Sequence, residues 1–274
     1  MNKIICDYKT ENLNFIRENE DFILRFDSYE SFRLFIEDRR NISKRYHYVV
    51  KMQYSSLSQF EIIDSLKYIN ADLIFCNLGD KVKVLTLIDK LRSLQLHIYL
   101  LTEDPTNYAS LKFLSSLGVD CGLWFEENAI VNDEDFIDLA SYHFMSPANH
   151  AHIEPFAYIG SHIQDERNIS LNELFLRGEE TYELDNNNNL VNVVTKKILC
   201  GLSEYSDNIQ QKDSTETKMH YYYRHFMDLD CCAKCKSFRI CCGSLKNKLK
   251  DCENTMNEIL DYVVLSSNVQ RNNM

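Results

Sequence analysis

Cysteine is the residue type whose number and spacing carry the clearest chemistry in this sequence. The chain of 274 residues has ten cysteines, and six of them fall between Cys231 and Cys252. Cys232 and Cys235 form a C-x2-C pair, Cys241 follows after five residues, and Cys252 comes after ten more. Four thiolates suffice for a tetrahedral zinc ion or for a cluster of four irons and four sulfurs. The sequence therefore predicts a metal site at Cys232, Cys235, Cys241 and Cys252.

The spacing leaves two choices open at this predicted site. Zinc and an iron–sulfur cluster are both compatible with four thiolates, and spacing alone does not choose between them. Cys231 and Cys242 each adjoin a proposed ligand, so the ligand register can also shift by one residue. The competing interpretation is a group of free thiols or a redox pair. Six basic residues against two acidic ones between 230 and 252 give this stretch a net charge of +4, which favours thiolates or simply marks a solvated surface.

The segment KSFRICCG around the third ligand carries a family resemblance. A C-x2-C-x5-C pattern with a more distant cysteine, a Phe and an Ile before the third cysteine and a Gly soon after it resembles the C-terminal half of a SPASM domain. That domain is the auxiliary iron–sulfur module of radical S-adenosylmethionine enzymes that modify peptides. The resemblance implies that Cys232, Cys235, Cys241 and Cys252 bind one 4Fe-4S cluster, the second auxiliary cluster of the family.

The chain also departs from this family at informative positions. Leu245 stands where the family has a ligand to the first auxiliary cluster, and Cys200 lacks the upstream glycine of the corresponding G-x4-C element. The C-x3-C-x2-C motif of the catalytic cluster is missing, since Cys6, Cys76 and Cys121 are solitary. The resemblance therefore implies a pseudo-radical-SAM accessory protein without catalytic residues, which binds a precursor peptide, a partner maturase, or both.

Histidines supply two further candidate sites. His143, His150, His152 and His162 lie near Glu154, and the H-x-H pair can hold a metal ion, which makes a metal-dependent hydrolase using segment 143–162 the enzymatic alternative. The competing interpretation is local packing and capping. His220 and His225 flank an aromatic run before the cysteines, where they can ligate, bond to cluster sulfurs, or help fill core. A zinc-stabilised interaction module remains the non-enzymatic alternative.

Charge and hydropathy narrow the partners and the compartment. The formal net charge of −11 disfavours nucleic acid as a partner. No apolar run has the length of a signal-peptide core or of a membrane span, so we expect a cytoplasmic protein with no membrane partner. In that reducing compartment, clustered thiols favour metal binding over disulfides.

The elements that must position these residues follow an α/β rhythm. Short strand-like runs at 48–54, 72–76, 97–101 and 120–125 recur about every 24 residues, the chain length of a βα unit. Helical patterns at 58–69, 81–94 and 107–117 separate them, and a fifth unit covers 134–145. Strands at 3–6 and 22–26 and a helix at 30–38 are expected before them.

This rhythm predicts a parallel sheet in a partial, degenerate (βα) barrel, with a small C-terminal cysteine-rich module. We assign 1–159 to the barrel-like domain, 160–218 to a connector with polar loops, and 219–274 to the SPASM-like domain. The connector includes the polar tract at 185–189 and a short segment at 190–202. An amphipathic helix is expected at 255–265. No glycine-rich phosphate loop and no G-x-S-x-G elbow can be written on the chain.

Overall fold

A computed structural model describes most of this chain. The described residues are 3–8, 22–38, 47–94, 96–126, 128–163, 171–175, 181–185, 187, 189–193, 198–201, 232, 234–241 and 243–272. Within these ranges, no helix combines the length and the apolar character needed to cross a bilayer.

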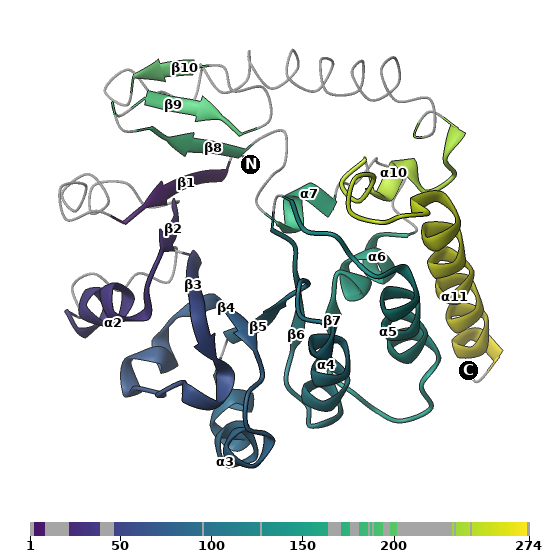
Figure 1. Ribbon diagram of the computed structural model, residues 1–274, viewed down its shortest axis with the longest axis horizontal. Helices are drawn as coiled ribbons and strands as arrows, with labels where there is room; N and C mark the ends of the chain where they lie inside the picture. The colour runs from purple at the N-terminus through teal and green to yellow at the C-terminus, as the bar shows by residue number, and fades with distance from the viewer. Residues whose placement is uncertain are drawn as a thin grey trace.

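The described strands form one ten-stranded sheet in the order β10-β9-β8-β1-β2-β3-β4-β5-β6-β7. Strands β1 to β7 are parallel, β8 joins β1 in parallel, and β9 and β10 add antiparallel hairpin strands. Figure 1 shows these strands along an arc. The strand bounds are Lys3–Asp7 (β1), Phe22–Phe26 (β2), His47–Ser56 (β3), Asn70–Asn77 (β4), Leu96–Leu101 (β5), Cys121–Trp124 (β6), Ile153–Glu154 (β7), Thr181–Leu184 (β8), Asn189–Asn192 (β9) and Ile198–Gly201 (β10).

The α/β class and the mostly parallel sheet confirm the sequence prediction at that level. Among the described strands β10 and β7 end the sheet and do not pair with each other, so the arrangement is an open sheet. The helices are Tyr29–Glu37 (α2), Lys81–Arg92 (α3), Thr106–Ser116 (α4), Asp133–Met145 (α5), Phe156–His162 (α6), Leu171–Leu174 (α7), Phe238–Cys241 (α10) and Cys252–Asn272 (α11).

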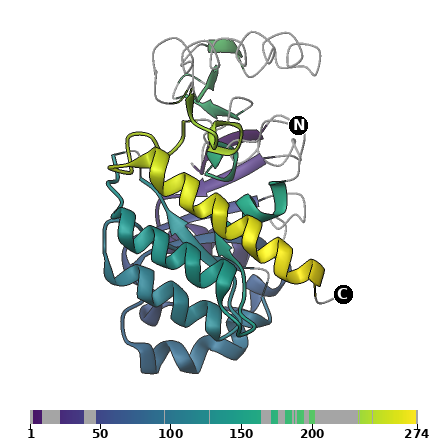
Figure 2. The ribbon, with the colours of Figure 1, turned by 90° about the vertical axis from the view of Figure 1, so that its right-hand side faces the viewer.

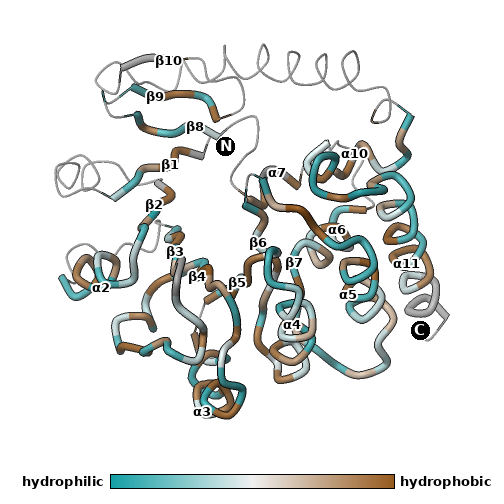
Figure 3. Tube along the Cα trace, in the orientation of Figure 1, coloured by the Kyte–Doolittle hydropathy of each residue, from teal (hydrophilic) through white to brown (hydrophobic). Residues whose placement is uncertain are grey.

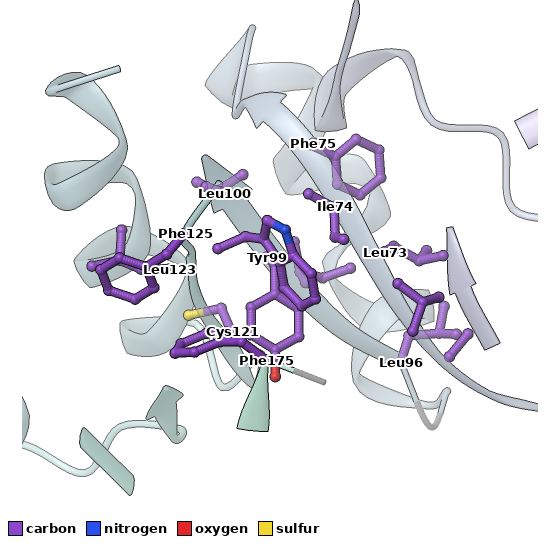
Figure 4. Close-up of a cluster of buried hydrophobic side chains, with 14 of the residues drawn as sticks. Leu73, Ile74, Phe75, Leu96, Tyr99, Leu100, Cys121, Leu123, Phe125 and Phe175 are labelled. Atoms are coloured by element: carbon purple, nitrogen blue, oxygen red, sulfur yellow. The ribbon is translucent and has the colours of Figure 1, made fainter. Parts of the chain in front are cut away.

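One face of the sheet, here called the helical face, is apolar and sealed. On it, Phe26 and Tyr48 pack against Phe32 and Phe35 of α2, with ring centroids between 5.2 and 6.3 Å apart. Alternation along each strand places every second side chain on this face. Most of those side chains are at most 3% exposed, among them Leu24, Phe26, Tyr48, Val50, Leu73, Phe75, Ile98, Leu100, Cys121 and Leu123. Figure 4 shows buried side chains from both faces of β4, β5 and β6, with Leu73, Phe75, Leu100, Cys121 and Leu123 from the helical face among them.

The other face, here called the polar face, has a different composition. The strand registers place many polar or charged side chains on it, among them Asp7, Arg25, His47, Lys51, Asp72, His97, Tyr99, Glu154 and Glu183. Arg25 bonds to both oxygens of Asp7 and to Glu183 at 3.3 Å, which ties the added strand β8 to β1 and β2. Phe175, just after α7, packs edge-on against Trp124 on the same face.

Residues 58–69 do not form the predicted helix. They form two short 3-10 turns, Leu57–Gln59 (η3) and Asp64–Tyr68 (η4), on either side of an extended stretch. The apolar residues Phe60, Ile63, Leu66 and Ile69 recur every three residues, and that period matches a 3-10 turn better than an α-helix with 3.6 residues per turn. Gln59 and Ser56 close a capping box that ends the preceding strand.

Part of the predicted connector extends the sheet. The polar tract at 185–189 is the turn between β8 and β9, where Asp185 accepts hydrogen bonds from the backbone of Asn187 and Asn189, each at 2.8 Å. Such side-chain-to-backbone bonds are the reason that Asp and Asn favour tight turns. The segment expected at 190–202 contributes to β9 and β10, and most of 202–218 lies outside the described residues.

The C-terminal helix is longer than predicted and lies along α5 (Figure 2). Hydrophobic and hydrophilic positions alternate along α11 in Figure 3, as an amphipathic helix requires. Its buried positions Met256, Ile259 and Val263 belong to the same hydrophobic cluster as the strands. The described part of the C-terminal segment therefore shares one continuous core with the sheet.

We expect Gly122→Ala to destabilise the fold by about 1–3 kcal/mol through overpacking. A methyl group built at Gly122 would lie 2.8 Å from Glu154 Cβ and 2.9 Å from Tyr99 Cε1, on the strands either side of β6. Urea unfolding of the two proteins measures the effect. Gly160→Ala in α6 is the matched control, because its nearest neighbour is a Phe144 ring atom at 3.2 Å and alanine improves helix propensity. Equal losses in the two variants would contradict the packing argument.

Candidate metal centre

The four predicted ligands lie on a short stretch around α10 and at the start of α11. Cys232 and Cys235 precede α10, Cys241 is its last residue, and Cys252 is the first residue of α11. Cys232 and Cys241 are 7% and 4% exposed, and the other two are half-buried. The fold therefore places all four on one compact segment.

Cys241 and Cys252 make side-chain contact with each other. The hydrogen bond between the two thiols lowers the pKa of Cys241, while the same contact together with burial raises the pKa of Cys252. Two thiols in contact share one proton more readily than they hold two negative charges. Ten residues of chain separate these cysteines, so the loop between α10 and α11 brings them together.

That loop also directs backbone donors at the Cys241 sulfur. The amides of Gly243, Ser244 and Leu245 each help to lower the pKa of Cys241, and the Ser244 amide donates to the Cys241 carbonyl at 3.0 Å. Gly243 has a φ of +77°, a left-handed conformation that a residue without Cβ adopts at little cost. Successive amides around one atom form an anion-binding nest, which favours a thiolate over a thiol.

Cys232 and Cys235 form a tight turn beside this pair. The Cys235 amide donates to the Cys232 carbonyl at 3.2 Å, and the Phe238 amide donates to the Cys235 carbonyl at 3.2 Å. Burial raises the pKa of Cys235, and Cys241 adds to that rise. Charge on Cys232 and Cys235 in turn raises the pKa of Cys252. The pKa of Cys252 therefore responds to each of the other three cysteines.

The described residues do not contain a closed coordination sphere. Among them, no group of three or more His, Cys, Asp or Glu has the arrangement of a metal site. Cys231, Cys242, His220 and His225 fall outside the described residues, so the alternative ligands stay predictions. The donor chemistry fits a thiolate-bound metal, since the four soft sulfurs lie on one segment and nearby backbone amides lower the pKa of one of them, Cys241.

Asp133, the first residue of α5, anchors the cysteine segment to the rest of the fold. Its carboxylate accepts the backbone amides of Lys250 and Asp251 at 2.9 and 2.7 Å. The Thr255 hydroxyl donates to the same carboxylate at 3.1 Å. One carboxylate thus satisfies orphan donors where α11 begins and joins α5 to α11.

A lysine places the segment at the carboxyl edge of the parallel sheet. Lys248 is 9% exposed and donates to the backbone carbonyl of Glu126, two residues beyond β6, at 2.5 Å. The Val131 amide donates to the Lys248 carbonyl at 2.8 Å. The Glu126 carboxylate pairs with Lys51 of β3 at 3.5 Å, so this contact extends to the polar face.

Leu245 has a structural role where the resembling family has a ligand. It is 1% exposed and belongs to the main hydrophobic cluster with Leu249. An apolar side chain buried there supplies packing in place of a sulfur. Its position is consistent with a segment organised around one set of thiols.

The histidine-rich segment is dispersed among local contacts. His143 lies against Phe144 and Phe156, and burial lowers its pKa to about 4. His162 bonds to the Tyr158 carbonyl in its own helix at 2.9 Å, and His150 bonds to the Ala151 carbonyl at 2.9 Å. Glu154 caps the next helix by accepting the Tyr158 amide at 2.9 Å. These contacts match the packing and capping interpretation of the segment.

Sequence reasoning did not identify Asp133 and Lys248 as positioning residues. Asp133 follows Asn132 at the start of a helix, where an acidic residue ordinarily signals only the helix N-terminus. Its partners lie 117 to 122 residues away, and no local pattern encodes such a contact. Lys248 belonged to a basic run that is typical of a solvated surface.

No family model, no curated protein and no solved structure matches this chain. The SPASM-like interpretation therefore depends on the cysteine motif.

We expect Asp133→Ala to lower the free energy of unfolding by about 1–2 kcal/mol, as loss of a helix-capping carboxylate does. Hydrogen exchange should become faster at 248–256 than at β4 and β5, because the lost bonds hold α11 against α5. Glu134→Ala is the matched control, since Glu134 is an exposed acid on the same first turn. Uniform acceleration across the sheet would argue against a local anchor.

Proposed function

We propose that this chain is an accessory protein of a peptide-modification system, with one metal centre at Cys232, Cys235, Cys241 and Cys252. The observation that supports the proposal most directly is the spacing of four cysteines within 21 residues of sequence, together with the side-chain contact between Cys241 and Cys252. The SPASM-like spacing favours a 4Fe-4S cluster as the bound group. Zinc is the alternative outcome of the same experiment.

The residues present suit a thiolate-bound group. When bound, it would cross-link the C-x2-C turn, the end of α10 and the start of α11. The amides of Gly243, Ser244 and Leu245 would stabilise negative charge on the Cys241 sulfur. Because α11 packs on α5 and Lys248 bonds to the chain beyond β6, this cross-link would stiffen the carboxyl edge of the sheet. Ligand sites of parallel α/β folds gather at that edge.

An accessory role also agrees with what the sequence lacks. The C-x3-C-x2-C motif of radical S-adenosylmethionine enzymes is missing. Cys6 and Cys121 are buried on the helical face, while Cys76 donates to the Ser55 carbonyl at 3.2 Å. Three solitary cysteines on three different strands would not supply that motif's ligands. Binding of a precursor peptide or a partner maturase is the remaining role that the resemblance implies.

Anaerobic purification with iron, acid-labile sulfide and zinc analysis tests the metal centre. We expect about four irons and four sulfides per chain and a brown colour. Cys235→Ser should lose most of the bound metal and destabilise mainly the segment around α10 and α11. Cys76→Ser is the matched control, because its hydroxyl can keep the bond to Ser55 and it lies on β4.

The outcomes separate the alternatives for this centre. One zinc per chain without sulfide would replace the cluster by a zinc-stabilised module. Unchanged metal content in Cys235→Ser would show that the ligand set is wrong. Metal that remains in a Cys235→Ser, Cys252→Ser double variant would instead point to the histidine-rich segment and the hydrolase alternative.

The accessory role implies binding without turnover. With S-adenosylmethionine and a strong reductant, the reconstituted chain should release no 5′-deoxyadenosine above the protein-free background. Calorimetric titration should detect binding of a precursor peptide encoded beside the gene, with the peptide's mass unchanged afterwards. Cleavage of S-adenosylmethionine, or no binding of any such peptide or of its maturase, would count against the accessory role.

A further inference from the structure

A second group of titratable side chains lies at the amino ends of the strands, whereas the cysteines lie beyond the carboxyl ends. Asp72 of β4 is 5% exposed, and its two carboxylate oxygens bond to two different histidines. His47 Nε2 lies 2.7 Å from one oxygen, and His97 Nδ1 lies 3.1 Å from the other. The three residues come from the adjacent parallel strands β3, β4 and β5, near the amino end of each.

Both imidazoles retain access to solvent. The side chains of His47 and His97 are 30% and 50% exposed, whereas that of Asp72 is 7% exposed. A buried carboxylate is costly unless it is paired, and here both hydrogen-bond partners of Asp72 are imidazoles. The hydrogen bond to Asp72 raises the pKa of His97, so this pairing depends on pH, which a pairing with Lys or Arg would not.

Further acidic side chains lie near this group. His97 faces three carboxylates, since Asp120 before β6 and Glu154 of β7 act on it in addition to Asp72. Tyr99, one position further along the same face of β5, lies within the field of Asp72 and Glu154. On the β3 side, His47 faces Asp72. His152, just before β7, lowers the pKa of Glu154. The surroundings of His97 are thus rich in acids.

We propose that His47, Asp72 and His97 form a pH-responsive clamp that holds the amino ends of β3, β4 and β5 together more firmly in mild acid than in mild base. With one imidazole protonated, the three side chains carry no net charge. With both neutral, the buried carboxylate of Asp72 and the nearby carboxylate of Glu154 have no cation between them. The clamp is independent of the proposed metal centre, which lies beyond the carboxyl ends of the strands.

The direction of each pKa agrees with this geometry. The hydrogen bond to Asp72 raises the pKa of His97, so its contribution is complete below the ordinary histidine value of about 6.5 and disappears as the pH rises through the raised value. Burial would raise the pKa of Asp72, but the two imidazoles lower it overall, so Asp72 stays ionised in this range. Burial also raises the pKa of Glu154, which again makes the fold weaker as the pH rises.

Thermal unfolding of the full chain between pH 6 and pH 8.5 tests the clamp, with metal content matched across samples. We expect the wild-type Tm to fall by roughly 2–4 °C more than that of His97→Asn over this range. Asparagine can keep a donor near the Nδ1 position but does not titrate. His162→Asn is the matched control, because the described hydrogen bonds of His162 go to residues of its own helix, α6. That control should keep the wild-type pH slope.

A direct readout keeps the proposal testable if a variant folds poorly. NMR titration of the wild-type imidazoles should give His97 a pKa above 6.5, and protection from hydrogen exchange should weaken at 47–50 and 70–73 at pH 8 after correction for intrinsic rates. Parallel Tm profiles for wild type and His97→Asn would overturn the clamp. A His97 pKa at or below 6.5 would overturn it as well.

Discussion

The burial of the sheet's helical face is the constraint on which the rest of this structure depends. A parallel sheet needs long crossovers, and those crossovers supply the helices that cover one face. Here α2 seals β2 and β3 with aromatic rings, and the Cys121 thiol donates to the Leu111 carbonyl of α4. Because that face is closed by apolar packing, the charged side chains of the described strands lie on the polar face and at the strand ends.

The position of the cysteine segment follows from the same packing. Helix α5 packs against α11. The carboxylate of Asp133 joins the first turns of the two helices through hydrogen bonds to Asp251 and Thr255. Lys248 adds a buried donor that reaches the chain beyond β6. The thiols are therefore held by the main core, and the pKa effects among Cys232, Cys235, Cys241 and Cys252 are consequences of that placement.

The carboxyl and amino ends of the strands carry different chemistry. Soft thiols and backbone donors lie near the carboxyl ends of the strands, while the imidazoles and carboxylates around Asp72 lie near the amino ends. On the polar face, Arg25 forms an ion pair with Asp7, and Lys51 forms one with Glu126. The polar face thus combines a charge-paired surface with a histidine group whose net charge depends on pH.

Local patterns in the sequence determined much of the fold. Runs rich in β-branched and aromatic residues predicted β3 to β6, apolar periodicity predicted α3 and α4, and helices were also expected close to the observed bounds of α2 and α5. The error at 58–69 came from a three-residue apolar period that suits both an amphipathic helix and successive 3-10 turns. The strands β8 and β9 were missed because their short runs lie in polar sequence and gain stability only by pairing with β1 and with each other.

The sequence by itself also determined the type and spacing of the candidate ligands, since C-x2-C geometry is local and thiol chemistry belongs to the residue. Tertiary structure alone decided which groups meet across long separations. Asp72 acquires His47 and His97 because parallel pairing brings residues 25 positions apart to adjacent strand ends. Asp133 meets the start of α11 because two helices pack on a common core. Such contacts arise from the burial of distant apolar surface, and no short-range pattern in the chain records them.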